Sequence, residues 1–210
     1  MTSVLRRVAL ASSLLTATLL PVLSAPAQAQ TQPPAADPAA AAVQTFYDGL
    51  TASMKAGGTA KSRYDKLKPA VDQSFDLAGM TALSVGTSWS AIPEADQKAL
   101  IDAFSRFTIA NYARNFDAYH GEKFTVDPMV NQRGNDKYVK STMKPTSGDA
   151  IAFNYRVHQA DGGWKIIDVY LAGNISTLAQ KRSDFGSTLA SGGAKALIAK
   201  INALADQMLN

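Results

Sequence analysis

Hydrophobic side chains recur with two different periods along this chain. From Val43 to Tyr119 they return every three or four residues, which predicts consecutive helices. Gly57-Gly58, a capping Asp76 and Pro93 mark the predicted breaks between them. The expected helices span residues 43–56, 61–72, 76–86 and 93–119. The last of these carries apolar stripes on two neighbouring faces, so it needs apolar contacts over much of its circumference.

The period then changes to two, which predicts β-strands. The expected strands span residues 124–130, 138–144, 151–158 and 164–171. Short turns rich in Gly, Asn and Asp separate them, so the strands should pair as antiparallel hairpins. The fourth strand has bulky groups on both faces and should be covered on both sides.

Helical spacing returns near the C-terminus. One helix is expected over about 175–190, Gly192-Gly193 interrupts it, and a last helix carries Leu197, Ile201, Leu204 and Met208. Helices, then a meander of strands, then helices predict an α+β fold. We expect one domain over residues 43–210, which is long enough for a sizeable core.

The first 42 residues have a different composition. Arg6 and Arg7 precede an apolar run of about 13 residues, shorter than the roughly 17–25 that span a bilayer. Ala27-Gln28-Ala29 then resembles a signal-peptidase site. We therefore predict a signal peptide over 1–29, export to the Gram-negative periplasm, and a flexible Pro/Ala-rich linker over 30–42. A membrane anchor is the alternative for this run.

Charge and composition exclude several classes of function. The formal net charge is +4, and loss of Arg6 and Arg7 with the leader lowers it to +2, so nothing indicates nucleic-acid binding. The sequence contains no cysteine, which excludes disulfides, thiolate catalysis and Cys-ligated metals. The two histidines, His120 and His158, do not have metal-ligand spacing, and His158 is interpreted as a solvated side chain.

Two carboxylates are the main candidates for chemistry. Asp168 lies in an apolar strand, where an unpaired charge would be unfavourable, so it should accept backbone hydrogen bonds or pair with an arginine. A small periplasmic enzyme that uses Asp168 or Asp76 with a histidine remains an alternative. An adaptor with a solid core and no ligand is a second alternative.

Short motifs in a fixed order resemble the MlaC/toluene-tolerance family of periplasmic lipid carriers. The matching segments are Phe75-Asp76 with Leu83-x-x-Gly86-x-x-Trp89, Asn111-Tyr112-Ala113, Tyr155-Arg156, Gly163-Trp164-Lys165, Asp168-Val169 and Arg182-Ser183-x-Phe185. Each motif is weak alone, but together they cover nearly all of the chain after the leader. The short loops and Ala-rich leader are similar to a hopanoid-associated branch, HpnM.

The resemblance implies a lipid carrier rather than an enzyme, with no cofactor and no metal. It implies a curved, mostly antiparallel sheet of four to five strands, with N-terminal and C-terminal helices around an apolar lipid cavity. The ligand would be a phospholipid or a hopanoid, moved between the inner and outer membranes. The implied partners are an inner-membrane transporter complex and an outer-membrane or efflux-type partner, with only transient membrane contact.

Site residues can be proposed from the same resemblance combined with the apolar faces. We expect the tails to contact Met80, Leu83, Phe104, Phe107, Tyr112, Phe153, Tyr155, Val169 and Ile175. We expect Arg156 and Arg182 to lie near the head group. Ordinary core packing is the alternative role for each apolar residue. A solvated face, or pairing with Asp168, is the alternative for the arginines.

Overall fold

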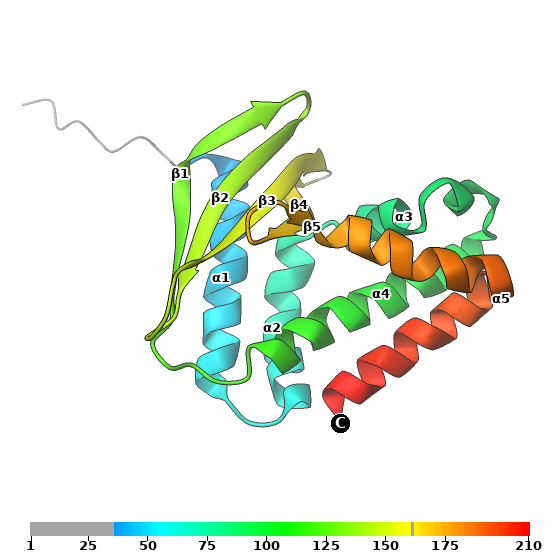
Figure 1. The fold of residues 1–210 in the computed structure, drawn as a ribbon, viewed down its shortest axis with the longest axis horizontal. Coiled ribbons are helices and arrows are strands. Elements are labelled where there is room, and N and C mark those ends of the chain that lie inside the picture. Colours follow the sequence, from blue (N-terminus) through cyan, green and yellow to red (C-terminus); the bar gives the residue numbers. More distant parts are fainter. Residues whose placement is uncertain (1–35, 161) are drawn as a thin grey trace, which may run out of the picture. The chain divides into compact units, whose positions relative to one another are not determined.

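The computed structural model describes residues 36–160 and 162–210. The predicted signal peptide over 1–29 and residues 30–35 of the predicted linker lie outside these residues. The described chain folds into five α-helices, one 3-10 helix and five strands (Figure 1). The predicted α+β class is confirmed, with the helices drawn from both ends of the domain around one antiparallel sheet.

The first helix, α1 (Pro38–Ala56), begins earlier than the sequence predicted. Asp37 caps it by accepting a hydrogen bond from the Ala39 N–H at 2.9 Å, and Pro38 suits the first turn because it needs no N–H partner there. Ala39 and Ala40 are buried. The linker prediction is therefore wrong for residues 38–42, because the alanines that resemble a linker pack as helix.

The second helix, α2 (Ala60–Ser74), returns alongside α1 after a turn at Gly57 and Gly58 (Figure 1). Both glycines have positive φ, which an L side chain disfavours. The two helices approach closely at Gly49, where an added Cβ would lie 2.1 Å from the Ala70 Cβ. This close approach fixes the position of α2 against α1, and α1 packs against the sheet.

Two further helices follow. Asp76 caps α3 (Leu77–Val85) through the Gly79 N–H at 2.8 Å, as predicted, and a 3-10 helix, η1 (Gly86–Ala91), comes next. The long helix α4 (Glu94–Asn115) ends before the predicted Tyr119. Phe116 leaves helical geometry there, and its side chain still packs against the core, so apolar spacing continues beyond the helix.

The five-stranded sheet has the order β1-β2-β3-β4-β5, and every neighbouring pair is antiparallel. Its strands are β1 (Lys123–Arg133), β2 (Asp136–Lys144), β3 (Ile151–Ala160), β4 (Gly163–Leu171) and β5 (Ile175–Ser176). The four predicted strands are confirmed. Residues 175–176 form the short β5 rather than the predicted start of a helix.

The last helix, α5 (Thr177–Leu209), contains a kink at Gly193, whose φ is 67°. The predicted interruption at Gly192-Gly193 is therefore confirmed. Beyond the kink the helix runs back along α4 (Figure 1), and Leu197 and Ile201 are buried there. At the N-terminal end of the domain, α1 packs against β1, β2, β3 and β4, so the sheet faces a layer of helices.

Candidate functional site

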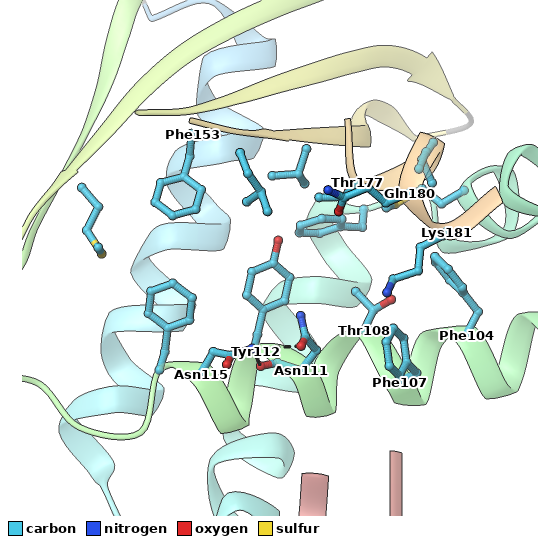
Figure 2. Close-up of a pocket in the computed structure, with 17 residues that line it drawn as sticks. Phe104, Phe107, Thr108, Asn111, Tyr112, Asn115, Phe153, Thr177, Gln180 and Lys181 are labelled. Atoms are coloured by element: carbon cyan, nitrogen blue, oxygen red, sulfur yellow. Dashed lines mark hydrogen bonds between the residues drawn. The ribbon is translucent and has the colours of Figure 1, made fainter. Parts of the chain in front are cut away.

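A cavity of about 410 Å³ opens between the sheet and the helices α3, α4 and α5 (Figure 2). Its floor comes from α4, its roof from the ends of β2, β3 and β4, and one end from the first turns of α5. The apolar lining residues are Phe75, Met80, Phe104, Phe107, Tyr112, Phe116, Met143, Phe153, Val169, Leu171 and Leu178. This volume is in the range of small-molecule pockets.

The polar lining residues gather on two helices. Thr108, Asn111 and Asn115 recur at helical spacing along α4, while Thr177, Gln180 and Lys181 belong to the first turns of α5. Asn115 and Gln180 are exposed, so they mark where the cavity meets solvent. In Figure 2, Phe153 lies on the side opposite Thr177, Gln180 and Lys181. The cavity is thus mainly apolar, and exposed polar residues lie where it meets solvent.

Six of the nine predicted tail-contact residues lie in this wall. They are Met80, Phe104, Phe107, Tyr112, Phe153 and Val169. They come from α3, α4, β3 and β4, and the fold brings them together although they are as many as 89 positions apart in the chain. Lipid contact by these residues remains a prediction, but their placement in one apolar wall agrees with it.

The other three predicted residues, Leu83, Tyr155 and Ile175, are not in the wall. Leu83 is half-buried against the core, and Ile175 on β5 is 47% exposed. Tyr155 is 1% exposed and donates a hydrogen bond to the Tyr47 hydroxyl at 3.0 Å. Tyr155 shares a strand face with Phe153, but it lies farther along β3, against α1.

Tyr155 belongs to a buried chain of hydroxyl groups. Ser141 donates its proton to the Phe153 carbonyl, so it accepts from Tyr47 at 2.6 Å, and Tyr47 accepts from Tyr155. Burial raises the pKa of Tyr155 well above its usual value and also raises the pKa of Tyr47. Both phenols stay protonated, so this network holds α1 against the sheet without a charge.

The two predicted head-group arginines also lie outside the wall. Arg156 donates from Nε to Asp136 Oδ2 at 2.7 Å, on the strand face opposite Tyr155. Arg182 donates from Nε at 3.0 Å and from Nη2 at 2.6 Å to the Leu83 carbonyl, where it ties α5 to α3. In this structure both arginines hold elements together, and a head-group role for them stays a prediction.

The carboxylates singled out from the sequence have structural partners. Asp168 is 4% exposed and accepts from the N–H groups of Val169 at 2.8 Å and Leu178 at 3.2 Å. It also accepts from the hydroxyls of Ser176 at 2.5 Å and Thr177 at 3.3 Å. The expectation of backbone hydrogen bonds is confirmed. Asp168 fastens the start of α5 to β4.

Asp76 lies beside a histidine, outside the cavity. His158 Nε2 is 2.9 Å from Asp76 Oδ2, and both side chains are about one quarter exposed, so the interpretation of His158 as a solvated side chain is wrong. Asp76 also caps α3, which occupies its other oxygen. Within residues 36–160 and 162–210, no three His, Cys, Asp or Glu side chains converge as metal ligands would. No helix in that same part of the chain has the length and apolarity to cross a bilayer.

Sequence reasoning missed the polar lining residues and five apolar ones. Asn111 and Asn115 lie on the side of α4 that carries Tyr112, so helical spacing could have predicted that they line the same cavity. Phe116 falls inside the helix predicted over 93–119, whereas the structure places it just after the end of α4. Met143 and Leu171 are at strand ends, where alternation alone does not show which face meets the cavity.

Two comparisons with known proteins agree with this geometry. The family model described as MlaC protein matches residues 41–203. The fold is similar to that of a phospholipid-binding protein from Ralstonia solanacearum, which was solved in complex with a phospholipid. The TM-score is 0.72 at 22% sequence identity, and the match covers 82% of this chain and 99% of the other.

Proposed function

Because this chain belongs to the MlaC family, we propose that it binds a phospholipid in its cavity and carries it between membranes. The observation that carries the proposal is the mainly apolar cavity with exposed polar residues where it meets solvent. An amphiphile fits such a site with its tails inside and its head group outside. The similar Ralstonia protein was solved with a phospholipid, which supports this class of ligand.

A carrier is needed because lipid tails are insoluble. Each buried methylene is worth about 0.8 kcal/mol, so exposing the ~30 methylenes of a diacyl lipid costs on the order of 20 kcal/mol or more. A protein wall that covers the tails removes most of that barrier. The aromatic and aliphatic side chains from α4 and the sheet offer such a wall.

The same reasoning argues against catalysis. Asp168 is occupied by four hydrogen bonds that join β4 to α5, and the Asp76–His158 pair lies outside the cavity. We therefore propose a binding protein that uses no catalytic residue and no cofactor. An adaptor with a solid core is disfavoured by the cavity itself.

We also propose a cellular compartment and protein partners for this chain. The leader predicted over 1–29 and the family favour the periplasm, with a transporter complex in the inner membrane and an outer-membrane or efflux-type partner. A hopanoid, as in the HpnM branch, remains the second ligand class. Membrane contact would be transient, because a carrier must release its lipid as well as capture it.

Native mass spectrometry of the purified protein, with lipid extraction of the same sample, tests the proposal. We expect a bound phospholipid at a single copy per chain. Added hopanoid should not displace it. A protein that carries no lipid and takes up none when lipid is supplied would overturn the carrier function and favour an adaptor.

A further inference from the structure

Lys181 brings a positive charge to the cavity wall. Among the lining residues that the structure describes, it is the one charged side chain, and no carboxylate lines the cavity with it. It belongs to the second turn of α5, beside Thr177 and Gln180 at the end of the cavity opposite Phe153. The local charge of the cavity is therefore positive.

The amine of Lys181 is not neutralised by a close partner. Within the described part of the chain, the carboxylate within reach is that of Asp184, and its Oδ2 lies 3.9 Å from Lys181 Nζ. That carboxylate is 61% exposed, so water screens it. The Lys181 side chain is 30% exposed and its Nζ lies 4.8 Å from the centre of the Phe107 ring. The amine therefore lies over an aromatic ring that lines the cavity.

Neutral hydrogen-bonding groups line the same cavity as the amine. Thr108 of α4 and Gln180 of α5 line the same end of the cavity as Lys181, and Asn111 lines it farther along α4. Figure 2 shows the side chains of Thr108 and Lys181 turned toward one another across the gap between α4 and α5. A cation beside an amide and a hydroxyl, whose carboxylate neighbour is exposed and 3.9 Å away, has the chemistry that recognises a phosphate oxygen.

We propose that Lys181 binds the phosphate of a lipid head group at the mouth of the cavity. The cavity would then select phosphate-bearing lipids over neutral lipids with the same tails, a neutral hopanoid included. This inference rests on the proposed function, and it assigns the head group to Lys181 rather than to Arg156 or Arg182. The tails extend from this point toward Phe153.

The expected size of the preference for phosphate lipids follows from the partial burial of Lys181. Hydrogen bonds to charged groups are stronger than neutral ones, and a cation that is one third exposed keeps part of that gain. A neutral lipid leaves Lys181 hydrated at the mouth and gains nothing from its charge. We expect the charge of Lys181 to contribute about tenfold to the preference for the phosphate lipid.

A competition between two lipids measures this preference directly. Delipidated protein is mixed with equal amounts of dioleoyl phosphatidic acid and dioleoylglycerol in a detergent without phosphate, and native mass spectrometry counts each complex. The wild-type chain should favour phosphatidic acid. The Lys181→Gln variant should lower the ratio of the two complexes about tenfold, and Lys181→Arg should keep most of it.

A matched control removes the same charge elsewhere. Lys195 is an exposed residue of α5, and Lys195→Gln should leave the ratio as in the wild type. An unchanged ratio in Lys181→Gln would overturn the head-group assignment while the carrier function stands. Uptake of neither lipid by the wild type would overturn the proposed function. Displacement of phosphatidic acid by equimolar inorganic phosphate would show a free-anion site and overturn the lipid assignment.

Discussion

At the scale of single residues, the hydrogen bonds of Asp168 indicate a structural role for this carboxylate. The carboxylate is buried, yet four donors from β4, β5 and α5 surround it. A buried charge with this many donors is stabilised where it stands. Its position, at the point where the chain leaves the sheet for α5, explains why an acid belongs in an apolar strand.

The substitution Asp168→Asn tests that role. The amide keeps the shape but loses the charge, and its NH2 group opposes a donor, so we expect the free energy of unfolding to fall by about 1–3 kcal/mol. Urea unfolding measures the change. Asp149→Asn, in the exposed β2–β3 loop, should stay within about 0.5 kcal/mol of the wild type. A full loss of function by Asp168→Asn at unchanged stability would instead support the enzyme alternative.

At the scale of elements, close approach of helices positions the wall of the cavity. Gly49 brings α1 against α2 at Ala70, and α1 in turn carries Phe46 and Tyr47 to the sheet. Tyr112 of α4, which lines the cavity, packs against Phe46 with ring centres 4.8 Å apart. The small residue at the α1–α2 contact therefore affects the floor of the cavity through one aromatic ring.

The substitution Gly49→Ala should destabilise the protein. The new Cβ would lie 2.1 Å from the Ala70 Cβ, so the helices must separate, which costs about 1–3 kcal/mol as in other overpacked cores. Gly186→Ala is the matched control, because nothing lies within 4 Å of an added Cβ there. The control should gain up to about 1 kcal/mol from helix propensity. Urea midpoints that shift in the same direction for both variants would contradict the packing argument.

Sequence periodicity predicted the elements better than the site. The hairpins were readable because alternation and Gly-containing turns agree locally, as at Gly162-Gly163. The end of α4 was misplaced because Phe116 and Tyr119 continue to pack after the helix stops. Phe153 and Tyr155 share a face, but only Phe153 meets the cavity. Such a difference depends on which helix lies opposite each residue, and local spacing does not contain that information.

At the scale of the whole molecule, packing is incomplete at the cavity between the sheet and α3, α4 and α5. Most core residues fill their space, as Val157 does at 0% exposure on β3. Val169 on β4 is almost equally buried at 4%, but it borders the cavity. The same enlargement therefore meets different surroundings at these two valines. Replacing each valine by phenylalanine therefore tests whether a binding cavity is present beside Val169.

We expect Val169→Phe to fill part of the cavity and to weaken phospholipid binding more than tenfold, since a ring that displaces about three methylenes removes ~0.8 kcal/mol for each. Its melting temperature should change little, because the ring has space. Val157→Phe should instead lose about 1–3 kcal/mol of stability, because its site is already packed. Lipid titration and thermal unfolding of both variants measure the two effects. If Val169→Phe destabilised the chain as much as Val157→Phe and still bound lipid normally, the tails would have to lie elsewhere than in this cavity.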